Sequence, residues 1–209
     1  MTLIRISSVE PRLSRPGLLA PALGLVRRAS AVGLLGDRDR IERLDLGLLQ
    51  GIARQASAAG VGGDAALALL GGQRAGPDRL AGLIERLDAA LSESPLPDLE
   101  LRALLRIFDV NQLAPLAGVS PISLRRYLAG SRTMPDALAA RIHWLALVAA
   151  DLAGAYNELG IRRWFERPRT QLEGRSPAQV LGTDWDPSTP VVGRVRDLAA
   201  ALAGPGSAT

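Results

Sequence analysis

Adjacent arginines in the middle of the chain offer the chemistry of nucleic-acid binding. Arg125 and Arg126 stand side by side, and Arg132 follows after a short gap. A guanidinium group can donate two parallel hydrogen bonds to the edge of a guanine, and it also pairs with backbone phosphates. Between residues 110 and 147 there are four arginines and one acidic residue, a local balance of +3 in a chain whose net charge is +4. The excess positive charge is therefore concentrated in this segment.

Residues that could carry catalysis or bind a metal are few. Cysteine is absent and His143 is the only histidine, which excludes thiol catalysis, iron–sulfur clusters and multi-histidine metal sites. Asp184 and Asp186 form an acidic pair, but the proline beside it favours a turn before a helix over a general acid and base. No glycine-rich phosphate-binding motif follows a predicted strand. We therefore expect no enzyme activity, no catalytic residue, no metal site and no cofactor.

The composition favours a globular protein of the cytoplasm. Of the 209 residues, 47% are hydrophobic and 22% are charged, close to the globular average. All 25 basic residues are arginine, which indicates the coding bias of a high-GC bacterium, so arginine richness by itself carries little functional weight. The apolar stretch over residues 17–35 is interrupted by Pro21, Arg27 and Arg28. We therefore predict neither a signal peptide nor a membrane span, and we expect a cytoplasmic protein.

The chain divides into two parts near residue 95. All the aromatic residues lie beyond residue 100, and Pro95 and Pro97 prevent a continuous helix across the boundary. Residues 1–95 are predicted to form a helical domain, with helices over 37–59 and 77–92 and either a strand or a disordered start over 3–9. The helix over 77–92 carries a stripe of five apolar residues, Leu80, Leu83, Ile84, Leu87 and Leu91. This domain is either a dimerisation or partner-binding module or a helical domain without an assigned role.

Residues 96–155 are predicted to form a helix-turn-helix domain. A helix over 98–110 precedes a short helix with apolar residues on one face. Gly118 stands where a helix C-terminus favours a left-handed residue, and Ser120 followed by Pro121 is the pattern of an N-cap and first helical position. Pro115 fits the first helix of the pair only if that helix begins at residue 112 or 113. A long apolar helix is expected over 135–156.

The second helix of the pair, over residues 121–129, could lie in the major groove of DNA. Ile122 and Leu128 are expected to face the core. His143, in the long helix, is expected to be a core or surface residue without a ligand role. The DNA-binding residues are expected to be Ser120, Ser123, Arg125, Arg126, Tyr127 and Arg132.

The last fifty residues contain a series of short motifs in a fixed order. After Tyr156 come a Trp-Phe pair at 164–165, Pro168, a Gly-x-Ser-Pro turn at 174–177 and a Val-Leu pair at 180–181. A final helix over 191–202 carries an apolar stripe. Together with the upstream helix-turn-helix, this order resembles the toxin-binding C-terminal domain of the Xre/MbcA/ParS antitoxin family. The resemblance covers residues 98–204, about half of the chain.

The resemblance implies both a fold and a function. Antitoxins of this family pair with RES-domain toxins, which consume NAD or transfer a group from it. The antitoxins commonly carry an Xre-like helix-turn-helix. It implies an all-α fold with a small helical toxin-binding subdomain over residues 156–204. It implies a homodimeric antitoxin of a type II toxin-antitoxin system that neutralises such a toxin and binds its own operator DNA. The implied toxin-binding residues are Trp164, Phe165, Pro177, Leu181, Val192, Arg194 and Arg196.

Some segments depart from the family pattern. Residues 182–190, with Trp185 and two prolines, replace the usual glycine-rich turn, and residues 205–209 extend beyond the usual end as an expected disordered tail. Residues 1–95 are also atypical of short antitoxins. The sequence therefore leaves open a second function, a helix-turn-helix transcriptional regulator or structural DNA-binding protein with no toxin partner.

Overall fold

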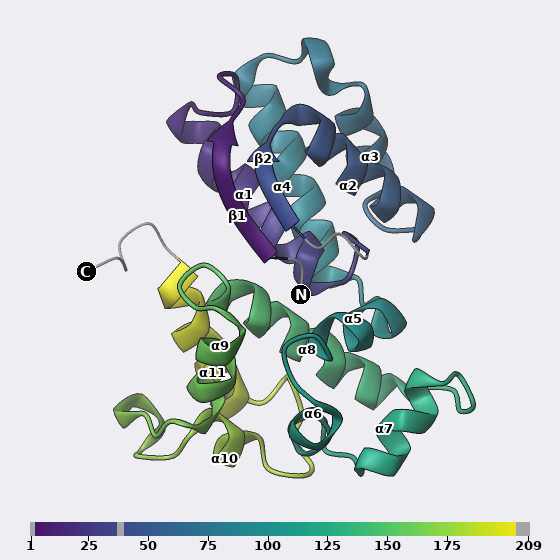
Figure 1. Cartoon of the computed structure of the whole chain (residues 1–209), viewed down its shortest axis with the longest axis vertical. Coiled ribbons are helices and arrows are strands. Elements are labelled where there is room, and N and C mark those ends of the chain that lie inside the picture. Colours follow the sequence, from purple (N-terminus) through teal and green to yellow (C-terminus); the bar gives the residue numbers. More distant parts are fainter. Residues whose placement is uncertain (1–2, 37–39, 204–209) are drawn as a thin grey trace. The chain divides into compact units, whose positions relative to one another are not determined.

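The chain divides between Pro95 and Leu96 into two compact units (Figure 1). The computed structural model describes residues 3–36 and 40–203, and the tail over residues 205–209 lies outside them. Within the described residues, helices account for most of the chain and only two short strands occur. The expected all-α class is therefore confirmed, with one small parallel sheet added to it.

The first unit contains this sheet. Strands β1 (Leu3–Val9) and β2 (Arg40–Leu44) run parallel, and helix α1 (Pro16–Ala31) lies between them in the chain. A parallel pair needs a crossover connection of this kind. A helix was expected over residues 37–59. This prediction was wrong for residues 40–44, which form β2. Helix α2 (Leu46–Ala58) begins only after Asp45, whose carboxylate accepts a hydrogen bond from the Leu48 amide. Residues 37–39 lie outside the described part.

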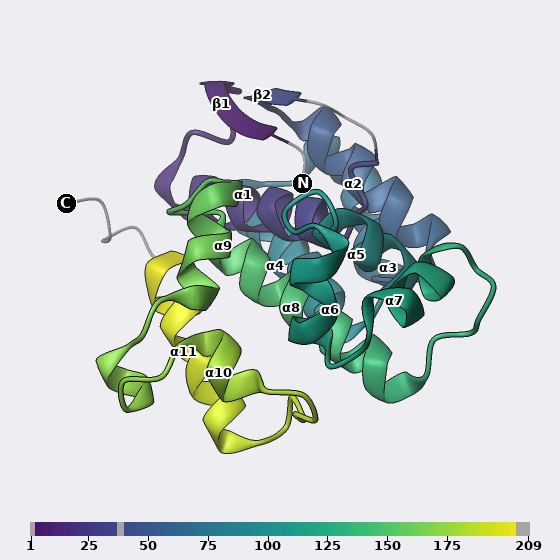
Figure 2. The ribbon, with the colours of Figure 1, turned by 60° about the horizontal axis from the view of Figure 1, so that its bottom comes forward.

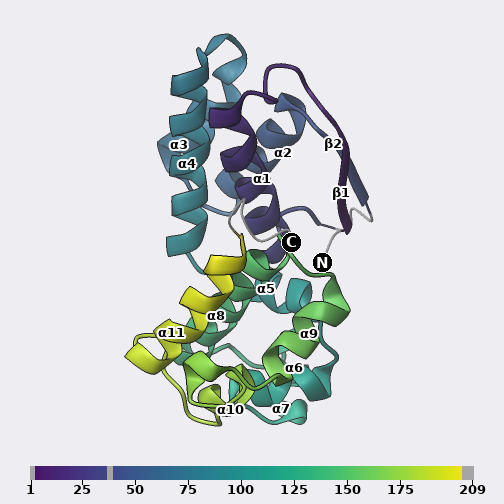
Figure 3. The same ribbon diagram turned by 90° about the vertical axis from the view of Figure 1, so that its left-hand side faces the viewer.

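The rest of the first unit is helical and contacts α1 mainly through its last long helix. Helix α3 (Gly63–Leu70), the short 3-10 helix η1 (Gly72–Arg74) and α4 (Pro77–Glu93) follow α2. Figure 3 shows α4 lying along α1, and the two helices make extensive contact. Arg28 in α1 and Asp88 in α4 form an ion pair of 2.8 Å. The five apolar residues of the predicted α4 stripe are all buried, so that prediction is confirmed.

The second unit is built around a long apolar helix. Helices α5 (Pro97–Leu104), α6 (Val110–Ala117) and α7 (Pro121–Leu128) lead to this helix, α8 (Asp136–Leu152). It is followed by α9 (Glu158–Glu166), the 3-10 helix η2 (Thr170–Leu172), α10 (Pro177–Leu181) and α11 (Pro190–Ala203). Helix α8 contacts α5, α6 and α11, and it lies among these helices in Figure 2.

The expected helix over residues 98–110 is shorter in the structure. Helix α5 ends at Leu104, and Asp109 caps a new helix by accepting hydrogen bonds from the amides of Asn111 and Gln112. The first helix of the helix-turn-helix therefore begins at Val110, and the condition that would place Pro115 in its first turn, a start at residue 112 or 113, is not met. Pro115 lies in the middle of α6, where it has no amide hydrogen to give the Asn111 carbonyl.

The C-terminal helices share one core with the helix-turn-helix. The ring of Phe108 packs edge-on against Phe165 with centroids 5.6 Å apart, and Phe165 packs in the same way on Trp164 at 5.3 Å. Buried residues from α5 to α11 belong to a single hydrophobic cluster. Residues 96–155 and 156–203 are therefore one packed body.

The loop between α10 and α11 is attached to the end of α6. The indole nitrogen of Trp185 donates a hydrogen bond of 2.8 Å to the Leu116 carbonyl, and its ring packs edge-on on Trp144 at 5.0 Å. From α8, Arg141 donates to the Trp185 carbonyl and to the Asp184 carboxylate, both at 2.7 Å. The loop that departs from the family pattern thus holds the helix-turn-helix in place.

Gly118 closes α6 in the predicted left-handed conformation, with φ of +73°. Its amide donates to the Pro115 carbonyl and the Val119 amide donates to Ala114, which is the hydrogen-bond pattern of a Schellman motif. A Cβ at this position would meet the Thr183 carbonyl oxygen and would lie 2.6 Å from Nη1 of Arg141. Glycine is therefore required both by the backbone conformation and by the close approach of the 182–185 loop.

The substitution Gly118→Ala is expected to lower the free energy of unfolding of the second unit by about 3 kcal/mol, from backbone strain plus the collision with the loop. Gly130→Ala is the matched control, because Gly130 has φ of +66° but no atom within 4 Å of an added Cβ. Its cost should be about 1 to 2 kcal/mol. Urea titration followed by tryptophan fluorescence measures both, since all three tryptophans lie in this unit. Equal losses in the two variants would contradict the close approach.

The substitution Trp185→Phe is expected to leave the buried Leu116 carbonyl without a donor, at a cost of about 1 to 3 kcal/mol beyond the loss of ring area. Trp144→Phe is the control, because it changes a ring in the same aromatic pair while the hydrogen bond to Leu116 remains. Urea unfolding followed by the two remaining tryptophans compares the variants. A Trp185→Phe protein as stable as the Trp144→Phe protein would show that the hydrogen bond is dispensable.

Candidate functional site

Helices α6 and α7 form the predicted helix-turn-helix pair, with residues 118–120 as the turn. Ser120 is the N-cap of α7, because its hydroxyl oxygen accepts a hydrogen bond of 3.1 Å from the Ser123 amide. Pro121 occupies the first helical position, where its missing amide hydrogen has no cost. The local signals that predicted the start of α7 are therefore confirmed.

The inner face of α7 is formed by residues at positions i, i+3 and i+4. Leu124 and Tyr127 are buried, and Leu128 is half-buried against the same core. Two predictions for this helix were wrong. Ile122, expected in the core, is 63% exposed, and Tyr127, expected to face DNA, is only 6% exposed. Two residues turn a helix by about 200°, so a stripe that includes Leu124 places residue 122 on the opposite face.

The outer face of α7 is a regular exposed stripe. Its members recur at i, i+3, i+4 and i+7, all four are exposed, and they are Ile122, Arg125, Arg126 and Ala129. We call these four residues the α7 outer face. Neither of its arginines has an ion-pair partner in the part of the chain that the structure describes. Ile122 is the apolar residue of this face. The sequence prediction assigned it to the core, although counting helical positions from Leu124 would have placed it outside.

The other predicted DNA-binding residues lie at the two ends of α7. Ser120 is exposed and donates its hydroxyl hydrogen to Oγ of the half-buried Ser123, at 3.0 Å. Arg132 is exposed beyond the C-terminal end, with its guanidinium carbon 5.4 Å from the ring centroid of Tyr127. This distance is that of a cation–π contact. Tyr127 therefore supports Arg132 from the core side and has no free ring face for DNA.

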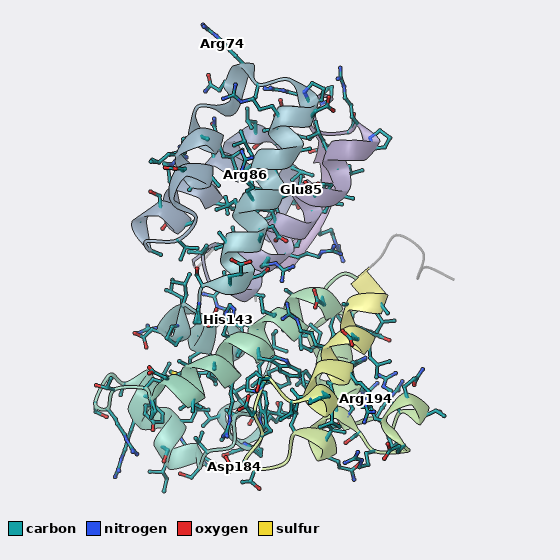
Figure 4. The ribbon with its side chains drawn as sticks, turned by 180° about the vertical axis from the view of Figure 1, so that it is seen from behind. Arg74, Glu85, Arg86, His143, Asp184 and Arg194 are labelled. Carbon is teal, nitrogen blue, oxygen red and sulfur yellow. The ribbon has the colours of Figure 1, made fainter. Side chains whose placement is uncertain are left out.

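Arg141 does not contribute to this surface, although the sequence counts it in the local positive charge. Its side chain is 14% exposed and is bound to Asp184 and to the Trp185 carbonyl. Figure 4 shows Asp184 at the edge of the second unit. Asp186 has a structural role too, because the backbone amide and then the hydroxyl of Ser188 donate to it and hold its pKa below the ordinary value of 3.8. The acidic pair is thus a turn, as predicted.

Five of the seven implied toxin-binding residues are in the core. Trp164, Phe165, Pro177, Leu181 and Val192 are all buried within the second unit. Large apolar side chains contribute most to stability when they are removed from water, and a small helical body has few other places for them. The expectation that these side chains offer a contact surface is therefore corrected, because they shape the fold beneath that surface.

The two remaining implied residues lie on α11. Arg194 is exposed and Arg196 is half-buried. Figure 4 shows Arg194 on α11, and its Nη2 lies 3.9 Å from a carboxylate oxygen of Glu173. An exposed pair at this distance contributes little stability. A partner can therefore bind Arg194 in place of Glu173 with little loss of stability.

Two cavities that the sequence did not predict adjoin α9. A cavity of about 360 Å³ is lined mainly by apolar residues of α6, α9 and α10, including Leu116, Phe165 and Ala178. A second, of about 180 Å³, is lined by Tyr156, Gly160, Trp164 and three arginines. The arginines converge on this cavity from α9 and the segment after it.

Metal and membrane sites have no support in the described residues. No group of three or more potential metal ligands occurs over residues 3–36 and 40–203. Within the same ranges, no helix has the length and hydrophobicity needed to cross a bilayer. His143 was predicted to be either a core or a surface residue. The structure shows it buried, with Nδ1 2.6 Å from a carboxylate oxygen of Glu100.

The α7 outer face is the strongest candidate site of the second unit, because its geometry fits a known mode of recognition. The surface of α11 is the second candidate. The chain matches no protein-family model, no curated protein and no solved structure. The support for both candidate surfaces therefore comes from the residues of this chain alone.

Proposed function

We propose that this protein is a DNA-binding antitoxin of a type II toxin-antitoxin system. It binds operator DNA through the α7 outer face and neutralises a RES-domain toxin through residues 156–203. The observation that carries the DNA-binding part is the α7 outer face itself, an exposed stripe with two unpaired arginines on the second helix of a helix-turn-helix. The protein acts by binding and carries out no reaction of its own.

The charge around α7 supports DNA binding. Residues 110–135 contain three arginines and no acidic residue, so no carboxylate in this segment repels the phosphate backbone. In helix-turn-helix proteins the N-terminal residues of the second helix reach the base edges. Ile122 has this position and is suited to a thymine methyl group, whereas Arg125 and Arg126 are suited to guanine or phosphate.

The order of motifs in residues 156–202 supports the antitoxin part. The Trp-Phe pair and the final helix pack in one hydrophobic cluster with the helix-turn-helix, and Ser176 of the Gly-x-Ser-Pro turn caps α10. Arg194 and Arg196 on α11 are the toxin-binding residues retained in the proposal, because the five apolar candidates are buried. In this proposal the protein acts as a homodimer in the cytoplasm, where operator DNA is found.

The burial of the apolar family motifs favours a second function. With Trp164, Phe165, Pro177, Leu181 and Val192 in the core, most of the family motifs are accounted for by packing alone. A helix-turn-helix regulator with no toxin partner needs nothing more than the α7 outer face. The two functions share the DNA-binding surface and differ in whether α11 contacts a toxin.

The double variant Arg125→Gln, Arg126→Gln is expected to weaken binding to the DNA upstream of the protein's own gene by about 10- to 100-fold. The slope of log affinity against log salt should become shallower by about 2, because two fewer counterions are released. Fluorescence anisotropy over a range of salt concentrations measures both quantities. In contrast, Ile122→Ala should weaken specific binding and leave the salt slope unchanged, because it removes no charge.

The control for this experiment is Arg79→Gln with Arg86→Gln, which removes the same charge from exposed positions of α4 in the first unit. Its DNA affinity and salt slope should equal those of the parent chain. Equal losses in the two double variants would reduce the effect to net charge and contradict the assignment of α7.

The double variant Arg194→Glu, Arg196→Glu is expected to abolish protection against a RES-domain protein encoded beside this gene, because charge reversal on α11 disrupts that interface without removing a core residue. Growth of cells that express both proteins measures protection, and operator binding should remain at the parental level. Arg79→Glu with Arg86→Glu is the control. A parent chain that binds the operator but protects against no RES-domain protein would leave the regulator function in place of the antitoxin.

A further inference from the structure

The 180 Å³ cavity beside α9 is strongly cationic. It is lined by Tyr156, Gly160, Arg163, Trp164, Arg167 and Arg169, with no acidic residue among them. Three arginines within a segment of seven residues thus line one small cavity. A concave site with several positive groups attracts anions and strengthens their binding by partly excluding water.

Within the described residues, the arginines of this cavity have no carboxylate partner, whereas some other arginines of the same unit do. Arg141 pairs with Asp184, and Arg175 lies 3.6 Å from Glu173. By contrast, Arg163 and Arg167 are exposed and have no ion-pair partner in the ranges that the structure describes. Their positive charge is therefore available to a ligand.

The third arginine carries an unsatisfied buried donor. The guanidinium carbon of Arg169 lies 5.2 Å from the ring centroid of Trp164, so the side chain is held against this ring. Its Nε is buried and has no hydrogen-bond partner. A buried donor without an acceptor is costly. Because this nitrogen is closed off from the cavity, an anion can supply the missing acceptor oxygen only after the Arg169 side chain shifts.

The aromatic wall of the cavity depends on Gly160. A Cβ at this position would lie 2.9 Å from Cβ of Tyr156 and 3.0 Å from its Cδ1. The absence of a side chain thus lets the Tyr156 ring lie against the first turn of α9. The tyrosine adds a hydroxyl group and a flat apolar face to the three cations.

We propose that this cavity binds the phosphoryl group of a small molecule. Each guanidinium presents a planar fork of donors that fits two phosphate oxygens, and the three positive charges exceed the two negative charges of a phosphate dianion. The shared chemistry is the phosphoryl group, either free or attached to a nucleoside whose base contacts Tyr156. The site is separate from the proposed DNA surface, because α9 and α7 lie at opposite ends of the second unit in Figures 1 and 2.

Calorimetric titration of the full chain with inorganic phosphate, adenosine monophosphate, adenosine and acetate tests this proposal. We expect both phosphate-bearing ligands to bind and adenosine and acetate to bind at least tenfold more weakly. Equal affinities for the two phosphate-bearing ligands identify the phosphoryl group alone as the ligand. Tighter binding of adenosine monophosphate identifies a nucleotide. Absence of binding by both, or acetate binding as tightly as phosphate, overturns the proposal.

Variants locate the site. Arg163→Gln with Arg167→Gln should weaken phosphate binding at least tenfold, whereas Arg102→Gln with Arg175→Gln removes the same charge from exposed positions outside the cavity and should leave it unchanged. Equal weakening in both double variants overturns the proposal. Operator binding by the Arg163, Arg167 double variant should remain parental, so a failure of this inference is distinguishable from a failure of the proposed function.

Discussion

The hydrogen bond from the Trp185 indole to the Leu116 carbonyl fixes the position of the helix-turn-helix. This carbonyl belongs to the last turn of α6, where helices leave carbonyl groups without an amide partner, and burial makes a partner necessary. The donor comes from a loop 69 residues later in the chain. Arg141 holds the same loop from α8, and Gly118 leaves room for it. The direction in which α7 leaves the turn therefore depends on the C-terminal segment.

Local signals in the sequence predicted much of the fold. The N-caps at Ser120 and Ser176 and the left-handed Gly118 were predictable because each depends on a hydrogen bond or dihedral angle within a few residues. The strand β2 was not predictable in this way. Only two of its five residues are buried, and it forms by pairing with β1, more than thirty residues earlier. Pro115 did not indicate where α6 begins, because Asp109 caps the helix at Val110 and leaves the proline beyond the first turn.

The candidate site was predictable only in part. The arginines of the α7 outer face followed from charge and helix position, but Ile122 and Tyr127 exchanged their expected places because the core fixes the rotation of the helix. The family resemblance identified residues such as Trp164 by type and order, and order does not distinguish a packing residue from a contact residue. The cationic cavity depends on how α9 and the segment after it meet, which no periodicity in the sequence encodes.

The single core of the second unit has a thermodynamic consequence. The aromatic contact between Phe108 and Phe165 belongs to the same cluster as Leu124 beneath the α7 outer face. Under the proposed function, a ligand of α9 or α11 that binds one arrangement of this cluster more tightly than another changes the affinity of α7 for DNA. Linkage requires that DNA then changes the affinity for that ligand by the same factor. Two surfaces on one core can therefore report on each other's occupancy without touching.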